Sequence, residues 1–208
     1  MQRFYRLGGL VLTIIIAMAI IKLSDKQPAP VTINHASLLD VIAKGESKGN
    51  YNAYFGNTHN QSIEFTKMTL KEVLDWQADF VNSGSPSNAV GKYQFIRPTL
   101  LSLVKERGID PNERFDEQLQ DDLAIALLEK RGLNEYVEGK IGRDQFANNL
   151  SKEWAALPQV TGDEQGKSYY DGDGLNKART SVDEVYEGIN KLEKEIEKDK
   201  PLKAPKDE

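Results

Sequence analysis

The chain has 208 residues, of which 39% are hydrophobic and 28% are charged, and its formal net charge is −5. This composition is typical of one globular domain with additional segments, and it excludes a wholly disordered protein. The sequence contains no cysteine, which excludes disulfides and a thiolate nucleophile. The negative charge argues against a general nucleic-acid-binding protein.

The N-terminal segment carries a membrane signal. Residues 7–21 form an uncharged, mostly apolar run of fifteen residues between Arg6 and Lys22. A membrane span usually needs about 20 apolar residues, and with its flanking residues this run predicts a transmembrane or signal-anchor segment over residues 7–23. A cleaved signal peptide is an alternative, because residues 17–19 have the small-x-small form of a cleavage site. A buried core helix is a third interpretation.

The rest of the chain divides by composition. We expect a cytoplasmic N-terminus at residues 1–6, a linker at 24–33, a folded domain at 34–190 and a charged, solvated tail at 191–208. Residues 1–30 carry four of the 27 basic and one of the 32 acidic residues, which leaves the remainder at −8. Such an acidic domain does not adhere to anionic surfaces by charge, so its affinity must come from a specific cleft.

Apolar periodicity and helix-boundary residues predict a mostly helical domain. The predicted helices lie near residues 37–43, 70–80, 98–106, 119–128, 143–156 and 182–196. We expect residues 50–66 to form a loop and a small β ribbon, with Ile63 and Phe65 alternating in one strand. Residues 84–91 and 162–175 are expected to be irregular. The predicted fold class is therefore α+β, predominantly helical.

Glu46 is the first candidate catalytic residue. It follows an apolar helical stretch and precedes a glycine- and asparagine-rich loop. A carboxyl at such a junction can be partly desolvated and still be reached by a ligand. Desolvation raises a carboxyl pKa, which suits a general acid near neutral pH. An ordinary surface glutamate near a helix end fits the same local pattern.

A second candidate segment precedes the helix near residue 98. Gly91, Tyr93 and Gln94 combine a small residue with an aromatic and an amide side chain. An aromatic ring and an amide can bind a sugar by stacking and hydrogen bonding. The alternative is that Tyr93 and Phe95 belong to the core and that Gln94 is only a turn residue.

These two segments, together with a third at residues 152–158, resemble the lysozyme-like superfamily, and more narrowly phage-lambda-type endolysins and lytic transglycosylases. The similar stretches are GESKGNYNAYFG at residues 45–56, AVGKYQFIRPT at 89–99 and KEWAALP at 152–158. The order and spacing of these stretches agree over residues 36–190. The resemblance implies a lysozyme-like fold and cleavage of the MurNAc–GlcNAc β-1,4 bond of peptidoglycan glycan strands, with no cofactor.

The resemblance also implies roles for particular residues. Glu46 corresponds to the catalytic acid, and Tyr93 and Gln94 correspond to substrate contacts. Ser47, beside the acid, and Tyr169, in the irregular segment, are further candidate substrate-binding residues. Trp154 has a matching position, but we expect it in the core, where tryptophan is usually buried.

The number of catalytic carboxyls decides the type of reaction. Most glycoside hydrolases use two carboxyls, but residues 47–63 contain no Asp or Glu. A lytic transglycosylase needs only one, which first protonates the glycosidic oxygen and then accepts the proton of the C6 hydroxyl. This mechanism is therefore favoured. A hydrolase with a second acid remains the alternative, with Glu64, Asp75 or Asp79 as candidates.

Several settings and rival functions stay open. The enzyme could serve phage lysis or virion entry, or open the bacterial wall locally. We expect it outside the cytoplasm, either anchored in the membrane through residues 7–23 or released. A non-catalytic module that binds glycan or scaffolds a membrane complex is the rival from another class. A metal-dependent hydrolase is disfavoured, because His35 and His59 are 24 residues apart without ligand spacing, and we expect no metal.

Overall fold

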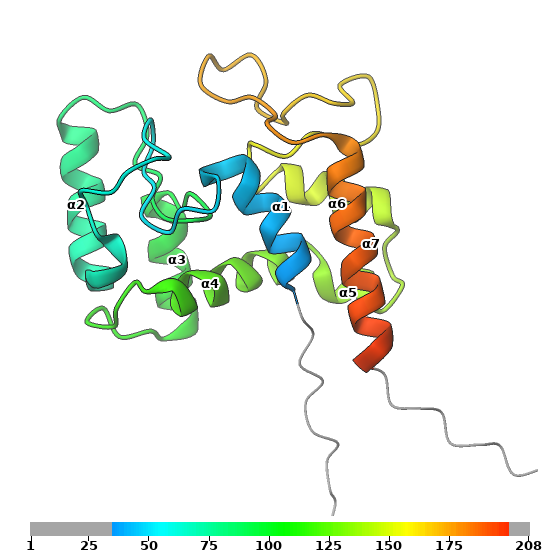
Figure 1. Ribbon diagram of the computed structural model, residues 1–208, viewed down its shortest axis with the longest axis horizontal. Coiled ribbons are helices and arrows are strands. Elements are labelled where there is room, and N and C mark those ends of the chain that lie inside the picture. The colour runs from blue at the N-terminus through cyan, green and yellow to red at the C-terminus, as the bar shows by residue number, and fades with distance from the viewer. Residues whose placement is uncertain (1–34, 200–208) are drawn as a thin grey trace, which may run out of the picture. The chain divides into compact units, whose positions relative to one another are not determined.

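The computed structural model describes residues 35–199, and these residues form seven α-helices (Figure 1). The helices are α1 Ala36–Ser47, α2 Leu70–Asn82, α3 Arg97–Arg107, α4 Glu117–Lys130, α5 Leu133–Val137, α6 Arg143–Ser151 and α7 Val182–Asp199. The predicted predominance of helix in the α+β domain is confirmed. Between residues 35 and 199 the β structure is limited to isolated antiparallel bridges and a named strand is absent.

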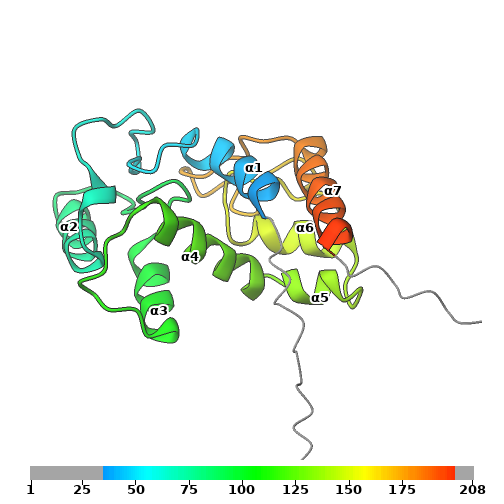
Figure 2. The same ribbon diagram turned by 60° about the horizontal axis from the view of Figure 1, so that its bottom comes forward.

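The long helix α4 lies at the centre of this arrangement. It lies between α2 and α3 on one side and α5, α6 and α7 on the other (Figures 1 and 2). The N-terminal helix α1 packs along α7. A Cβ at Gly188 would lie 3.0 Å from the Val41 side chain, so the glycine permits this close approach of the two helices.

The apolar side of α7 explains where the folded part ends. Val185, Ile189 and Leu192 are fully buried and Ile196 is nearly so, as their helical spacing predicts. The helix continues to Asp199, beyond the predicted end of the domain at residue 190. Because Leu192 and Ile196 belong to the core, the segment after residue 190 is not a solvated tail over its whole length.

Two helices begin at capping boxes, which the sequence patterns Thr69-x-x-Glu72 and Ser181-x-x-Glu184 favour. At α2 the Thr69 amide donates to the Glu72 carboxylate at 2.8 Å, and the Glu72 amide donates to the Thr69 hydroxyl at 3.2 Å. At α7 the Ser181 amide donates to the Glu184 carboxylate at 2.8 Å, and the Glu184 amide donates to the Ser181 hydroxyl at 3.2 Å. Each box satisfies amides that the helix itself leaves without partners.

Within the predicted loop and β ribbon at residues 50–66, the strand expected at Ile63 and Phe65 is wrong. Phe65 begins the 3-10 helix η1 Phe65–Lys67 instead. The Asn60 side-chain amide donates to the Ile63 carbonyl at 2.7 Å, and its oxygen accepts from the Ile63 amide at 3.1 Å. The Asn52 side chain accepts from the Thr66 amide at 2.9 Å. Asparagine side chains thus bind the backbone groups that a partner strand would have used.

The helix α6 also ends earlier than the predicted boundary at residue 156. It ends at Ser151, and a tight turn follows in which the amides of Glu153 and Trp154 both bind the Leu150 carbonyl. Trp154 is buried in the core, as expected. Because the chain leaves the helix here, the Ala156 amide is free to bind a group outside it.

The predicted anchor segment at residues 7–23 lies outside the described residues. Within residues 35–199, every helix is too short or too polar to cross a lipid bilayer.

Candidate active site

A glycine brings the end of α1 against the turn that follows α6. A Cβ at Gly45 would lie 2.9 Å from the Ala156 Cβ and 3.0 Å from a methyl carbon of Thr180. Any side chain at this position would therefore push α1 away from its neighbours. The close contact places Glu46 where its Oε1 accepts a hydrogen bond from the Ala156 amide at 2.9 Å.

Glu46 is nearly buried, with 8% of its surface exposed. Burial raises the pKa of its carboxyl to about 7, although the Ala156 hydrogen bond and the positive charge of Arg179 act to lower it. The other carboxyl oxygen, Oε2, has no hydrogen-bond partner within the described part of the chain. A carboxyl with this pKa is partly protonated near neutral pH, as a general acid must be.

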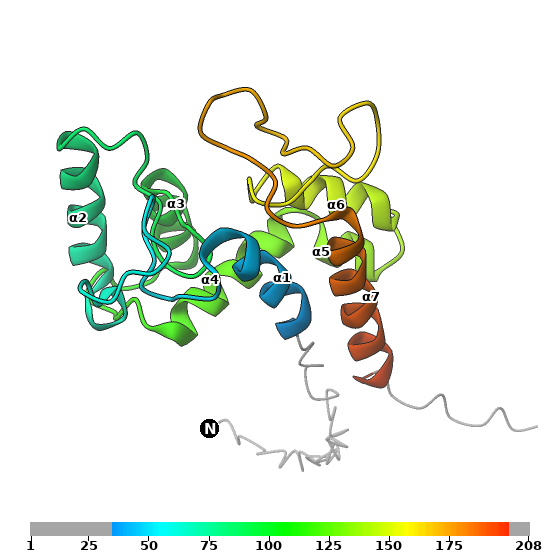
Figure 3. The same cartoon turned by 45° about the horizontal axis from the view of Figure 1, so that its top comes forward.

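Glu46 lines a cavity of about 960 Å³, which is at the upper end of the usual range for small-molecule sites. The loop after α2 and the segment before α7 lie on the same side of the end of α1 (Figure 3), and both contribute to the cavity. The lining includes Phe55, Ser87, Gln94, Ile96, Glu153, Tyr170, Asn176 and Arg179. The cavity is therefore built from segments that are distant in the sequence, and it combines apolar, amide and charged groups.

Of the predicted substrate-binding residues, Gln94 lines this cavity. Its backbone has a φ of 51° in the left-handed region, and its side-chain amide donates to the Gly91 carbonyl at 2.9 Å. This bond holds the side chain over its own turn. The structure thus brings Gln94 into the same cavity as Glu46.

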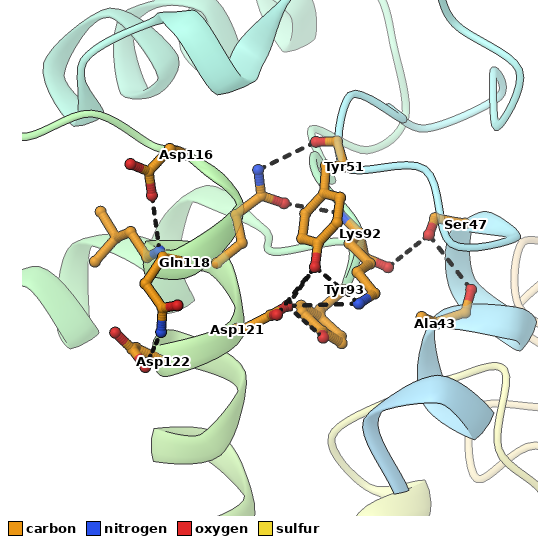
Figure 4. Close-up of polar contacts among 11 residues, drawn as sticks. Ala43, Ser47, Tyr51, Lys92, Tyr93, Asp116, Gln118, Asp121 and Asp122 are labelled. Carbon is orange, nitrogen blue, oxygen red and sulfur yellow. Dashed lines mark hydrogen bonds and ion pairs between the residues drawn. The ribbon is translucent and has the colours of Figure 1, made fainter. Parts of the chain in front are cut away.

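The structure does not bring Ser47 and Tyr93 into this cavity, because both side chains are buried and lie outside its lining. The Ser47 hydroxyl donates to the Lys92 carbonyl at 2.6 Å. The Tyr93 hydroxyl donates to Asp121 at 2.6 Å. Figure 4 shows both contacts between the end of α1, the turn at Lys92 and α4. Their polar groups are therefore engaged within the protein.

Tyr169 is 49% exposed and is not part of the lining, whereas its neighbour Tyr170 is. The Tyr170 hydroxyl donates to the Lys152 carbonyl at 2.7 Å. This bond ties the irregular segment to the turn after α6. The cavity lining thus includes the neighbour of the predicted residue, and a substrate contact at Tyr169 stays a prediction.

The predicted second acids lie elsewhere. Glu64, Asp75 and Asp79 are absent from the cavity lining, and the first two pair with the exposed lysines Lys67 and Lys71. Each of these three acids lies on a solvated surface, where a charged side chain is common and needs no catalytic role to account for it.

The structure brings a different carboxyl, Glu153, into the cavity. Its side chain is 13% exposed, and both Nε and Nη2 of Arg131 lie 2.7 Å from its Oε2. Sequence reasoning missed this pair, although Glu153 lies within the KEWAALP stretch. Among the described residues, Glu46 and Glu153 are the two acids that line the cavity.

The two histidines are not brought together. His35 precedes the first turn of α1, whereas His59 contacts the Lys48 ammonium near the other end of that helix, at 3.3 Å. Between residues 35 and 199, groups of three or more His, Cys, Asp or Glu side chains that could hold a metal ion are absent.

The sequence model of the Endolysin family matches residues 36–179. The chain belongs to this family. The match begins with α1 and includes every residue that lines the cavity. Family membership identifies the chain as a phage-type peptidoglycan-degrading enzyme that acts on the cell wall, outside the cytoplasm. Neither a curated protein nor a solved structure matches the chain.

Proposed function

We propose that the chain is a lytic transglycosylase that cleaves the MurNAc–GlcNAc β-1,4 bond with Glu46 as its single catalytic carboxyl. The observation that carries this proposal is the position of Glu46. Glu46 is a nearly buried carboxyl whose pKa is raised to about 7. It lines a cavity large enough for part of a glycan chain.

The reaction then has two proton transfers at one residue. The protonated Glu46 gives its proton to the glycosidic oxygen, and the C1–O4 bond breaks. The acetamido group of the substrate stabilises the positive charge at C1. The Glu46 carboxylate then accepts the proton of the C6 hydroxyl while O6 bonds to C1, which closes the 1,6-anhydro ring and regenerates the acid. Water is not consumed in this sequence.

The state of the second carboxyl in the cavity supports one-carboxyl chemistry. Glu153 is held by two nitrogens of Arg131, so it is committed to an ion pair and is poorly placed to activate a water molecule. Glu64, Asp75 and Asp79 are outside the lining. A hydrolase that uses Glu153 is nevertheless the second candidate, because this residue shares the cavity with Glu46.

For substrate contacts we propose Gln94 together with the cavity residues Phe55, Tyr170 and Asn176. The aromatic rings offer apolar faces for sugar rings, and the two amides offer donors and acceptors for hydroxyl and acetamido groups. We retain residues 7–23 as the proposed segment that delivers the domain across the cytoplasmic membrane during phage lysis. This last proposal rests on the sequence alone.

Mass spectrometry of the released muropeptides tests the reaction type. The purified chain is incubated with peptidoglycan, and the sugar ends of the products are compared with those from a hydrolytic lysozyme. A transglycosylase gives 1,6-anhydro ends, which are lighter by one water molecule than reducing ends. Reducing ends would contradict the proposal and point to Glu153 as a second acid. Absence of products from the folded chain would favour a binding module.

A further inference from the structure

A polar cluster outside the cavity joins three separate segments of the chain. It consists of Tyr51 after α1, Lys92 and Tyr93 in the turn before α3, and Asp121 in α4; we refer to it as the Asp121 cluster (Figure 4). The Tyr51 and Tyr93 hydroxyls donate to Asp121 at 2.9 and 2.6 Å. The Lys92 ammonium donates to the Tyr51 hydroxyl at 2.9 Å.

A second set of contacts joins the same segments through their backbones. The Gln120 side chain of α4 accepts from the Lys92 amide at 2.9 Å and donates to the Tyr51 carbonyl at 3.2 Å. A Cβ at Gly91 would lie 2.4 Å from the Gln120 side-chain oxygen, so only glycine permits this contact. The Ser47 hydroxyl adds a direct bond from α1 to the Lys92 carbonyl at 2.6 Å.

The location of these contacts is informative. Ser47 follows Glu46 directly, and Tyr93 precedes Gln94 directly. Glu46 and Gln94 line the cavity, whereas the four members of the Asp121 cluster do not. The cluster therefore lies behind the residues that face the substrate, and it can affect cleavage only through their positions.

Charge makes the cluster sensitive to a single change. The Lys92 side chain is only 13% exposed, and its ammonium lies 3.6 Å from Asp121 and 4.5 and 5.2 Å from the Tyr51 and Tyr93 rings. Burial acts to lower the pKa of Lys92, but the Tyr51 hydrogen bond and the charges of Asp121 and Asp40 raise it overall. Loss of the Asp121 charge would leave this cation with weaker compensation.

Both phenols remain donors over the pH range of interest. Burial and the contact with Asp121 raise the pKa of Tyr93 well above its ordinary value. Burial also raises the pKa of Tyr51. The cluster therefore keeps its hydrogen-bond pattern while Glu46 titrates.

We propose that Asp121 is a positioning residue that, through Tyr51, Lys92 and Tyr93, fixes the Glu46-bearing end of α1 relative to the Gln94-bearing turn. The proposal rests on the proposed role of Glu46. A displacement of about 1 Å at a reacting group can lower a rate about 100-fold, so partial loosening of the cluster lowers kcat more than it weakens binding.

The test measures kcat and KM of the full chain on soluble, uncross-linked glycan strands for Tyr93→Phe and Asp121→Asn. We expect kcat to fall about tenfold with little change in KM, because geometry rather than contact is altered. The alkaline limb of the pH profile stays in place, because the cluster does not contact Glu46. Lys92→Met behaves in the same way, and Lys92→Arg restores part of the rate.

Tyr136→Phe is the matched control. The Tyr136 hydroxyl also donates to a carboxylate, that of Glu193, and Tyr136 is not part of the cavity lining. The substitution removes a phenol–carboxylate hydrogen bond without changing the Asp121 cluster, so we expect the parental kcat. Thermal unfolding of each variant shows whether it is folded.

Parental kcat in folded Tyr93→Phe and Asp121→Asn variants would overturn the positioning role while leaving the role of Glu46 intact. An equal loss of kcat in Tyr136→Phe would also overturn it, because general destabilisation would then explain the effect. A folded parental chain that cleaves no glycan would instead overturn the proposed function, and the positioning role with it.

Discussion

The end of α1 and the turn after α6 place two nearly buried carboxyls in one cavity, with different partners. Glu46 accepts one backbone amide from Ala156, whereas Glu153 is bound by two nitrogens of Arg131. Burial raises the pKa of Glu46 to about 7, although the Ala156 amide and the charge of Arg179 act to lower it. The two carboxyls therefore differ in their partners: a single backbone amide leaves Glu46 as the proposed proton donor, whereas Glu153 is held in an ion pair.

The largest expected effect comes from exchanging each carboxyl for its amide. Glu46→Gln should lower the rate of muropeptide release by about 1,000-fold, since a general acid contributes about 100- to 10,000-fold. Glu153→Gln should lower it by less than about tenfold, because Glu153 has no proposed role in proton transfer. Release rates from purified peptidoglycan check both. A Glu46→Gln variant with substantial activity would remove the distinction between the two carboxyls.

The second effect is on stability. The folded state raises the Glu46 pKa from 4.5 to about 7, so it binds this proton more tightly than the unfolded state does. The resulting stabilisation is complete below pH 4.5 and is lost as the pH rises through about 7. It amounts to about 3 kcal/mol of unfolding free energy.

Glu46→Gln removes this pH dependence. We expect the variant to have parental stability at pH 4 and to exceed the parental chain by about 3 kcal/mol at pH 8. Urea unfolding at the two pH values checks this. An equal difference between variant and parent at both values would show that the Glu46 carboxyl titrates normally.

A steric change at the contact beneath Glu46 should have a smaller effect. Gly45→Ala places a methyl group 2.9 Å from the Ala156 Cβ, and overpacking of this kind costs about 1–3 kcal/mol. Gly142→Ala is the control, because its Cβ would meet no atom within 4 Å and the backbone φ is −80°. Chemical denaturation of both variants measures the difference. Equal stability of the two would contradict the tight contact.

The smallest effect concerns the pH profile. Arg179 lowers the pKa of Glu46 through its positive charge, so Arg179→Gln should raise that pKa. Because the acid must be protonated, the alkaline limb of the activity profile then moves to higher pH. Lys177→Gln removes a charge from the same segment at a residue outside the cavity lining and should leave the limb in place. A shift to lower pH in Arg179→Gln would contradict the assignment.

Local sequence signals were sufficient for much of the fold. The capping boxes at Thr69 and Ser181 and the apolar spacing of α7 are determined by residues close in the sequence, so the corresponding helices were predictable. The strand expected at Ile63 and Phe65 was not formed, because alternation says nothing about asparagine side chains that bind the same backbone groups. The asparagine contacts depend on how the loop folds back on itself, which the alternation of apolar residues does not indicate.

The candidate site shows the same limit. Glu46 and Gln94 could be proposed from short stretches, but those stretches do not reveal which of two adjacent residues faces the cavity. Ser47 and Tyr93 therefore received roles that their burial does not support. The Arg131 partner of Glu153 and the position of Arg179 beside Glu46 depend on tertiary packing, and no local pattern indicates them.

Titration of the Glu46 carboxyl shows directly whether this residue can donate a proton near neutral pH. Carbon-detected NMR of the chain labelled at glutamate carboxyls, with Glu46→Gln used to assign the signal, gives its midpoint. We expect a midpoint of about 7. A midpoint near the ordinary value of 4.5 would leave Glu46 ionised at neutral pH and would contradict its role as the proton donor.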